Sequence, residues 1–383
     1  MIDQSKRLYS VEEYYFSRKL REVSKMISSG ESVINMGVGS PDMNPSQKVI
    51  NAIKSSLSDP FAHKYQSYQG IPKLRKAISN FYKKFFGVRL NYNDEILPLL
   101  GSKEGIMHIS LAFLNPGDKV LIPNPGYPTY LSATKLVEAK PIFYDLKEKN
   151  NWFPKIEDLE RKDLSQVKLI WINYPHMPTG SSADIGKFEK LVKFARKHNI
   201  LIVNDNPYSF ILNDNFISIL NIHGAKDLAL ELNSFSKTFN MSGWRIGMLL
   251  GSSTNISRVL KVKSNMDSGM FYGVQMGAIA ALNLDKNWFN ELNKIYKKRR
   301  ELIWKVADAL GCTYNKNSKG LFVWAKLPKK IKNCEDYVDK LLADKKIFIA
   351  PGTIFGSNGE GFIRFSLCID ENKIKQAIKR LDL

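Results

Sequence analysis

Short apolar runs alternate with longer amphipathic segments from about residue 43 to residue 280. The apolar runs that predict buried strands are 96–100, 120–122, 169–173, 200–204, 228–232 and 246–250. The segments whose apolar residues recur at helical spacing include 71–86, 104–114 and 188–198. Strands that alternate with helices predict an α/β architecture with a mostly parallel sheet. In such sheets, ligands bind beyond the carboxyl ends of the strands.

The two ends of the chain have a different pattern. Residues 11–27 have roughly helical spacing, and residues 33–38 predict a short strand that breaks into a glycine–proline turn. After residue 285 the pattern predicts a long helix over 285–310 that stops at Gly311. Strands at 321–325 and 362–367 and a final helix at 373–381 complete a smaller α+β lobe. No polar linker separates the two lobes, so we expect them to pack closely.

Composition and charge exclude some classes of protein. The net charge is +20, which is compatible with nucleic-acid binding. However, the basic residues are spread in small groups, so a lysine-rich solvated surface is the favoured explanation and no nucleic-acid partner is expected. Three cysteines are too few and too far apart for a disulfide framework or a zinc site, and no metal site is expected. The polar start and the lack of a long apolar run predict a cytoplasmic protein without a membrane anchor.

The stretch from Asn233 to Arg245 holds the first candidate chemistry. It follows the predicted strand 228–232 and contains Ser234, Ser236, Lys237 and Arg245. Hydroxyl groups and an arginine near a strand end suit an anionic group such as a phosphate. A lysine between them is well placed to form an imine with an aldehyde. An ordinary solvated loop explains the same residues equally well when the stretch is taken alone.

Three further loops follow predicted strands. Residues 101–105 lie at the predicted start of a helix, where free backbone N–H groups can bind an anion. Alternatively, Ser102 only caps this helix. Tyr127 lies in a proline-rich loop and either stacks on a planar ligand or packs within the loop. Asn173 either donates to a ligand or satisfies its own turn.

Two charged residues lie in apolar surroundings. Asp205 ends the apolar run 200–204 and needs a partner, which is either a structural group or a protonated ring nitrogen that Tyr208 also reaches. Arg364 lies inside a predicted strand with apolar neighbours, so it is either paired internally or binds a carboxylate.

Together, these residues resemble the class I/II aminotransferases, which are pyridoxal-phosphate enzymes of fold type I. The resemblance covers nearly the whole chain and is strongest in Ser234-Phe235-Ser236-Lys237 with Arg245, in Asp205-Asn206-Pro207-Tyr208, and in Arg364. It points to the branch with aspartate-type and diaminopimelate-type enzymes. It implies a large domain (residues 45–284) with a mostly parallel seven-stranded sheet, a small domain (residues 1–44 and 285–383), and a homodimer with shared active sites.

The resemblance implies a role for each residue around the cofactor, pyridoxal 5'-phosphate. Lys237 matches the lysine that forms an imine with the cofactor and shuttles a proton. Asp205 matches the partner of the pyridine nitrogen, and Tyr208 matches the donor to the ring oxygen. Tyr127 matches the aromatic residue that stacks on the ring and also borders the substrate. The remaining expected cofactor-binding residues are Ser102, Lys103, Asn173, Ser234, Arg245 and, reaching the neighbouring subunit, Tyr65.

On the substrate side, Arg364 matches the arginine that holds the α-carboxylate, and Gly39 matches a glycine whose backbone lies beside the substrate. Met177 departs from the family pattern, which has asparagine in Asn-Pro-Thr-Gly. A thioether cannot donate a hydrogen bond, so the change either lowers or specialises activity, or it is tolerated. The stretch 261–268 lacks the arginine of dicarboxylate-specific relatives, although Lys261 or Lys263 could substitute for it.

The resulting hypothesis is an aminotransferase that moves an amino group between an L-amino acid and a 2-oxo acid by a ping-pong mechanism. A carbon–sulfur β-lyase of the same fold is the nearest alternative. A weakly catalytic, cofactor-binding regulatory protein is the alternative from a different class.

Overall fold

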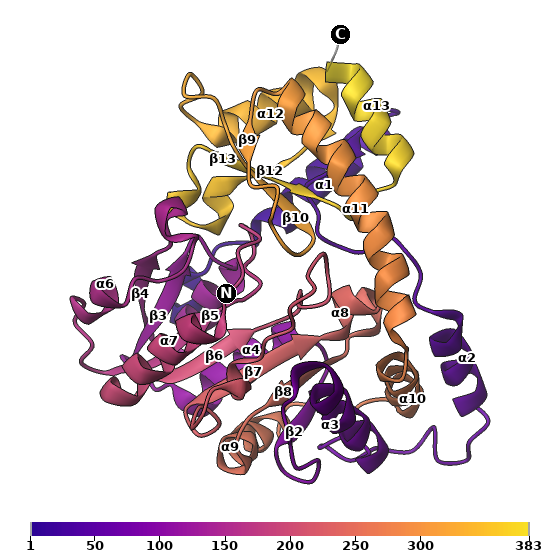
Figure 1. Cartoon of the computed structure of the whole chain (residues 1–383), viewed down its shortest axis with the longest axis vertical. Coiled ribbons are helices and arrows are strands. Elements are labelled where there is room, and N and C mark those ends of the chain that lie inside the picture. The colour runs from indigo at the N-terminus through magenta and orange to yellow at the C-terminus, as the bar shows by residue number, and fades with distance from the viewer. Residues whose placement is uncertain (1, 382–383) are drawn as a thin grey trace.

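The computed structural model describes residues 2–381, and its largest element is a seven-stranded sheet (Figure 1). The strands are β2 Ile96–Leu99, β3 Lys119–Asn124, β4 Lys140–Asp145, β5 Val167–Ile172, β6 Leu201–Asp205, β7 Ala229–Ser234 and β8 Gly247–Leu250. They lie in the order β2-β8-β7-β6-β5-β3-β4, in which β8 is antiparallel to both its neighbours and the other pairs are parallel. The predicted α/β class with a mostly parallel seven-stranded sheet is confirmed. Residue 1 and residues 382–383, which end the predicted domain ranges, lie outside the described residues.

Both faces of this sheet are buried, which explains why its central strands are nearly continuous apolar runs. In β5, Leu169 and Trp171 contribute to one hydrophobic core, while Ile170 and Ile172 contribute to another. This division follows from the alternation of side chains along a strand. The helices of this part are α2 Gln47–Ser56, α3 Pro72–Phe86, α4 Ser102–Phe113, α5 Pro128–Leu136, α6 Ile156–Glu160, α7 Ile185–His198, α8 Phe235–Thr238, α9 Ser253–Lys263 and α10 Tyr272–Leu282.

A four-stranded antiparallel sheet and helices from both ends of the chain form a second group, at the top of Figure 1. Its strands are β9 Thr313–Tyr314, β10 Phe322–Lys326, β12 Ala350–Pro351 and β13 Phe362–Ser366, in the order β12-β13-β10-β9. Its helices are α1 Tyr15–Ser28, α11 Lys286–Ala309, α12 Cys334–Lys345 and α13 Glu371–Leu381. A parallel pair, β1 Ile34–Asn35 with β11 Ile347–Phe348, joins the N-terminal segment to this group. Short 3-10 helices occupy Lys6–Ser10, Glu148–Asn150, Ile219–Asn221, Ser242–Trp244, Gly352–Phe355 and Ser357–Gly359.

Helix α11 connects the two groups. Its Phe289 packs in the core of the large sheet, while Leu292 and Tyr296, one and two turns later, pack in the second core. Figure 1 shows this helix running down one side of both groups. The close packing expected from the lack of a linker is thus observed.

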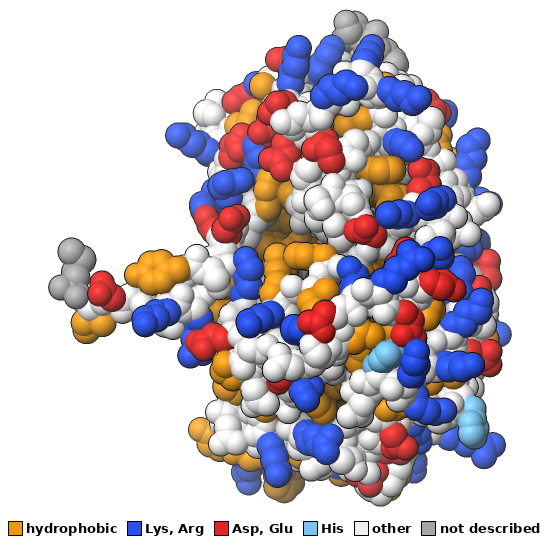
Figure 2. Space-filling model, turned by 90° about the vertical axis from the view of Figure 1, so that its left-hand side faces the viewer, with side chains coloured by type: hydrophobic (Ala, Val, Ile, Leu, Met, Phe, Trp, Pro, Cys, Tyr) orange, Lys and Arg blue, Asp and Glu red, His pale blue; other side chains and the backbone are white. Residues whose placement is uncertain are grey.

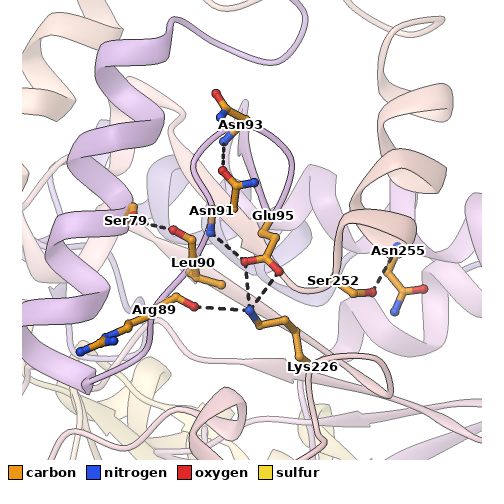
Figure 3. Close-up of polar contacts among 9 residues, drawn as sticks. All are labelled: Ser79, Arg89, Leu90, Asn91, Asn93, Glu95, Lys226, Ser252 and Asn255. Carbon is orange, nitrogen blue, oxygen red and sulfur yellow. Dashed lines mark hydrogen bonds and ion pairs between the residues drawn. The ribbon is translucent and has the colours of Figure 1, made fainter.

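The amino end of β2 is fixed by a polar cluster shown in Figure 3. Glu95 accepts hydrogen bonds from Lys226 Nζ at 2.9 and 3.0 Å and from the backbone N–H of Asn91 at 2.7 Å. Ser79 Oγ on α3 donates to the carbonyl of Leu90 at 2.7 Å. These bonds hold β2 against α3 and the turn before β7. Because β2 leads directly to Gly101 and α4, they also fix where α4 begins.

The sequence pattern did not predict strands β4, β9, β11 and β12 or helices α2, α5, α6, α8, α9, α10 and α12. Strand β4 lies at the edge of the sheet, and its short apolar run 142–144 is flanked by Pro141 and by the exposed Asp145. Helix α10 is apolar almost all round and includes two glycines, so it has no helical periodicity to detect. The predicted helix over 11–27 is also wrong at its start, because α1 begins at Tyr15.

Charged side chains are dispersed on the face drawn in Figure 2, where lysines and arginines alternate with acidic residues. That face has no single basic patch. Among residues 2–381, no helix combines the length and the apolar character needed to cross a bilayer.

Candidate active site

A cavity of about 370 Å³ lies between the carboxyl edge of the large sheet and the second group of elements. Asp205 is the last residue of β6, Ser234 is the last residue of β7, and Asn173 directly follows β5. Parallel strands bring these three positions to one edge. All predicted site residues except Tyr65 line the cavity: Gly39, Ser102, Lys103, Tyr127, Asn173, Asp205, Tyr208, Ser234, Lys237, Arg245 and Arg364.

Lys237 is held by the short helix α8. The side chain of Ser234 accepts a hydrogen bond from the backbone N–H of Ser236 at 3.1 Å and so caps this helix. Lys237 Nζ donates to the carbonyl of Gly39 at 2.5 Å. Burial lowers the pKa of Lys237, and the nearby Arg364 and Arg245 lower it further. A lowered pKa favours the neutral amine, which is the nucleophilic form.

Asp205 is a buried carboxylate with one unpartnered oxygen. Tyr130 Oη donates to Asp205 Oδ2 at 2.9 Å, and Oδ1 has no partner. The ring of Tyr130 stacks on Trp171 at 4.9 Å, which fixes the direction of this bond. Burial raises the pKa of Asp205 to about 7, although Tyr130 and Lys237 oppose the rise. A cation placed at Oδ1 would therefore be bound strongly by the ionised carboxylate.

The start of α4 has the features of an anion site. Gly101 precedes the helix with a φ of +95°, and a side chain at this position would collide with the guanidinium of Arg245. Ser102 and Lys103 are the first two helical residues, and their N–H groups have no partner within the helix. Burial lowers the pKa of Lys103, and the charge of Arg245 adds to this effect. Two cations and a helix N-terminus at one end of the cavity suit a phosphate group.

Arg364 also lines the cavity and lies among aromatic rings. Its guanidinium carbon is 4.0 Å from the ring centre of Phe322, 4.6 Å from that of Phe355 and 5.4 Å from that of Phe16. Nη2 donates to the carbonyl of Gly37 at 2.6 Å, and Nε has no partner. Burial lowers the pKa of Arg364 to about 10, so it stays charged at neutral pH. No acidic side chain pairs with it among the described residues, which leaves it free to bind a carboxylate.

Asn173 and Met177 are tied together. The side chain of Asn173 donates to the carbonyl of Asp205, and it accepts a hydrogen bond from the backbone N–H of Met177 at 2.6 Å. Met177 is buried, and its sulfur lies 3.4 Å from Nη1 of Arg364. Asn173 therefore satisfies its own turn, which is one of the two alternatives open from the sequence. The thioether occupies a place beside the arginine.

Tyr65 lies outside the cavity, and 90% of its surface is exposed. Its neighbour Gln66 packs against Gly269, where a side chain would collide with the backbone carbonyl of Gln66. Lys263, which the sequence left open as a substrate-binding cation, is buried and forms an ion pair with Asp267 at 2.8 Å. That lysine is not available to a substrate.

The sequence reasoning missed several cavity residues. Tyr14, Phe16 and Leu20 come from the N-terminal segment and α1, whereas Phe322 and Phe355 come from the second group. Aromatic residues in these segments match ordinary core positions, so no sequence signal marked them. Tyr130 was also missed, although it lies three residues after Tyr127.

Outside the cavity, Glu104, His108 and Asp267 place potential ligand atoms within 4.8 Å of one another, which is the one such group found among residues 2–381. His108 Nε2 lies 3.0 Å from Glu104 Oε1, and Lys263 pairs with Asp267. The buried ammonium of Lys263 supplies the positive charge that these carboxylates need. The group is best described as a polar link between α4 and α9.

Comparison with known proteins gives a consistent result. The family model for class I and II aminotransferases matches residues 31–381. An LL-diaminopimelate aminotransferase from Dehalococcoides mccartyi is 38% identical over 379 residues, which cover 98% of this chain and 97% of that protein. One from Aquifex aeolicus is 38% identical over 383 residues, with 100% and 99% coverage. The structure of substrate-bound BacF from Bacillus subtilis superposes with a TM-score of 0.94 at 32% identity and covers 99% of this chain and 97% of that chain.

These similarities extend over nearly the whole chain and favour transamination over the β-lyase and the regulatory alternatives. The chain belongs to the class I and II aminotransferase family and is a pyridoxal-phosphate-dependent transaminase of fold type I.

Proposed function

We propose that the residues of this cavity bind pyridoxal 5'-phosphate and carry out both halves of a ping-pong transamination. The observation that carries the proposal is the convergence of three complementary groups in one cavity. These are the unpartnered Asp205 Oδ1, the Lys237 amine and the anion site at Ser102, Lys103 and Arg245. They match the ring nitrogen, the aldehyde and the phosphate of the cofactor, respectively.

Each group has a distinct task in this proposal. Ser234 caps α8 and keeps Lys237 at the end of β7, where its amine can take a proton from the substrate α-carbon and return it to the product. The cofactor, when bound, supplies an electron sink for the pair left on that carbon. Asp205 holds the ring nitrogen in its protonated form because the ionised carboxylate lies in a buried, low-dielectric site. Tyr208 is buried beside Phe322, with ring centres 5.7 Å apart, and supplies the hydroxyl for the ring oxygen.

The remaining groups orient the substrate and the cofactor. Arg364 holds the α-carboxylate, and Gly39 lines the substrate with its backbone. Tyr127, whose ring centre lies 5.6 Å from that of Tyr130, would cover the pyridine ring of the bound cofactor. Asn173 contributes by fastening the loop that carries Met177.

We extend the proposal to a cytoplasmic homodimer in which Tyr65 completes the partner's phosphate site. Its support is an exposed apolar surface on two adjoining segments, with Phe61 and Tyr65 on one and Met266 and Phe271 on the other. The proposed division places residues 45–284 in the large domain and residues 1–44 and 285–383 in the small domain. The cavity then lies at their junction.

The test is an absorption titration of the purified protein. Added pyridoxal 5'-phosphate should produce a visible band that amino acids convert to the pyridoxamine form and that 2-oxo acids restore. Lys237→Ala should abolish the absorption band of the covalent bond between Lys237 and the cofactor. It should also lower the transamination rate by about 10²–10⁴-fold or more, as expected for loss of a general acid–base group. Release of pyruvate and ammonia without a 2-oxo acid would contradict the assignment.

A further inference from the structure

The walls around Arg364 determine which amino acids the site can accept. The α-carboxylate and the side chain of an amino acid are attached to the same carbon. A substrate held by Arg364 therefore extends its side chain into the cavity that the groups around this arginine line. Those groups are the rings of Phe16, Phe322 and Phe355 and the thioether of Met177.

The neighbouring wall is also apolar or aromatic. Tyr14 lies next to Phe16, with ring centres 5.8 Å apart, and Leu20 and Val38 complete this side of the cavity. Tyr14 also covers Lys103, whose Nζ lies 4.5 Å from the ring centre. This ring therefore contacts both the lysine at the anion site and Phe16, which packs on Arg364.

All charged side chains of the cavity already have a task. Lys103 and Arg245 lie at the anion site, Asp205 faces the ring nitrogen, Lys237 carries the reactive amine and Arg364 binds the α-carboxylate. Neither a cation nor a carboxylate remains for a second charged group on the substrate.

In the stretch 261–268 of the neighbouring subunit, Lys261 is exposed, so its charge stays in water. The stretch 261–268, which would face the partner's site, contains no arginine. Its Lys263 is buried and ion-paired with Asp267, and Ser264 Oγ donates to its own helix at 3.2 Å.

From this we infer that the enzyme takes amino acids with uncharged, apolar side chains, aromatic or long aliphatic, and the matching 2-oxo acids. The inference rests on the proposed function, because it uses Arg364 as the α-carboxylate site. A distal charge would be removed from water without a partner, which is costly, whereas an apolar side chain gains from burial against these rings. Phe16 is a specificity-determining residue in this arrangement.

The test compares amino donors on the cofactor-loaded enzyme. For each donor we measure the rate constant of cofactor conversion and divide it by the apparent dissociation constant. The apolar donors are L-phenylalanine, L-methionine and L-leucine. The charged donors are L-aspartate, L-glutamate and LL-diaminopimelate. We expect the apolar donors to exceed the charged ones by about 100-fold. A preference for any charged donor overturns the inference while transamination itself stands. If no donor converts the cofactor, the proposed function fails together with the inference.

A variant separates the side-chain wall from the α-carboxylate site. Phe16→Ala should lower the ratio of kcat/KM for phenylalanine over alanine by about tenfold. Weakened carboxylate binding would lower both values equally and leave the ratio unchanged, which would contradict the role of Phe16. Ser17→Ala, at an exposed position of the same helix, is the matched control and should keep the wild-type ratio.

Discussion

Replacing Asp205 with asparagine is expected to stabilise the cofactor-free protein, and the gain should depend on pH. In the folded protein, burial raises the pKa of Asp205 to about 7, from an ordinary value of 3.8. Between these pH values the folded state binds more protons than the unfolded state. The free energy of unfolding therefore falls as the pH rises through this window, and it levels off above pH 7. Asparagine carries no charge, so the free energy of unfolding of the variant does not fall in this way as the pH rises.

The size of the effect follows from the same two values. The difference between 7 and 3.8, at about 1.4 kcal/mol per pH unit, gives about 4 kcal/mol at pH 8. Between pH 5 and pH 7 the change is about 2 kcal/mol, because half of the folded molecules are still protonated at pH 7. The oxygen of asparagine can still accept the bond from Tyr130, so the substitution changes the charge more than the packing.

Urea unfolding of the cofactor-free proteins at pH 5, 6, 7 and 8 measures this difference. The free energy of unfolding of Asp205→Asn minus that of wild type should increase with pH up to pH 7 and then stay constant. Other titrating groups are common to both proteins and cancel. Asp94→Asn, at an exposed position, is the control and should show no such trend. A difference that is flat from pH 5 to 8 would refute the argument that burial of Asp205 dominates its ionisation.

Two other substitutions test further parts of the site, and a third tests the buried His176, which lies in the turn next to Met177. Burial lowers the pKa of His176 to about 3, so stability should be lost as the pH falls below 6.5; between pH 7 and pH 4, His176→Gln should remove about 3 kcal/mol of that loss, measured by urea unfolding at the two pH values. Arg364→Lys should raise KM for every donor about 10- to 100-fold in steady-state assays, because lysine cannot make two parallel bonds to a carboxylate. Met177→Asn should raise the transamination rate with common donors about tenfold or more, because hydrogen bonds to charged groups contribute about 1.5–3 kcal/mol. An unchanged rate and an unchanged absorption titration would contradict the role given to Met177.

The sequence predicted most of the central sheet because burial of both faces leaves a simple signal, a continuous apolar run. It failed for β4, whose edge position allows exposed residues, and for α10, whose all-round burial removes the helical period. Boundaries shifted by one or two residues where caps, rather than hydrophobicity, end an element. Helix α4, for example, begins at Ser102 rather than Glu104.

The site was predicted as far as its residues follow strands or carry unusual chemistry for their surroundings. Those criteria identify Asp205, Lys237 and Arg364, which line one cavity. They do not identify Phe16 or Phe322, because an aromatic residue in a helix or strand matches any core position. Their place at the site depends on how the N-terminal segment and β10 pack, and this packing is a tertiary property without a local sequence pattern.

Glu231 shows that a buried strand can also conceal a charge. It lies inside the run 228–232, which was assigned as an apolar strand, and it is fully buried. Burial raises the pKa of Glu231, while hydrogen bonds from the backbone N–H of Ile219 at 3.1 Å and from Tyr82 at 3.0 Å oppose the rise. Asn204 also donates to it, at 3.2 Å.

These bonds connect Glu231 to the positions next to the catalytic edge. Asn204 directly precedes Asp205, and Asn233, which donates to Tyr82 at 2.8 Å, directly precedes Ser234. A buried carboxylate without bound donors would be costly, so these hydrogen bonds favour the observed register of the two strand ends with Glu231. The polar network behind the sheet therefore fixes the relative positions of Asp205 and the lysine-bearing helix. It does so with residues that do not line the cavity.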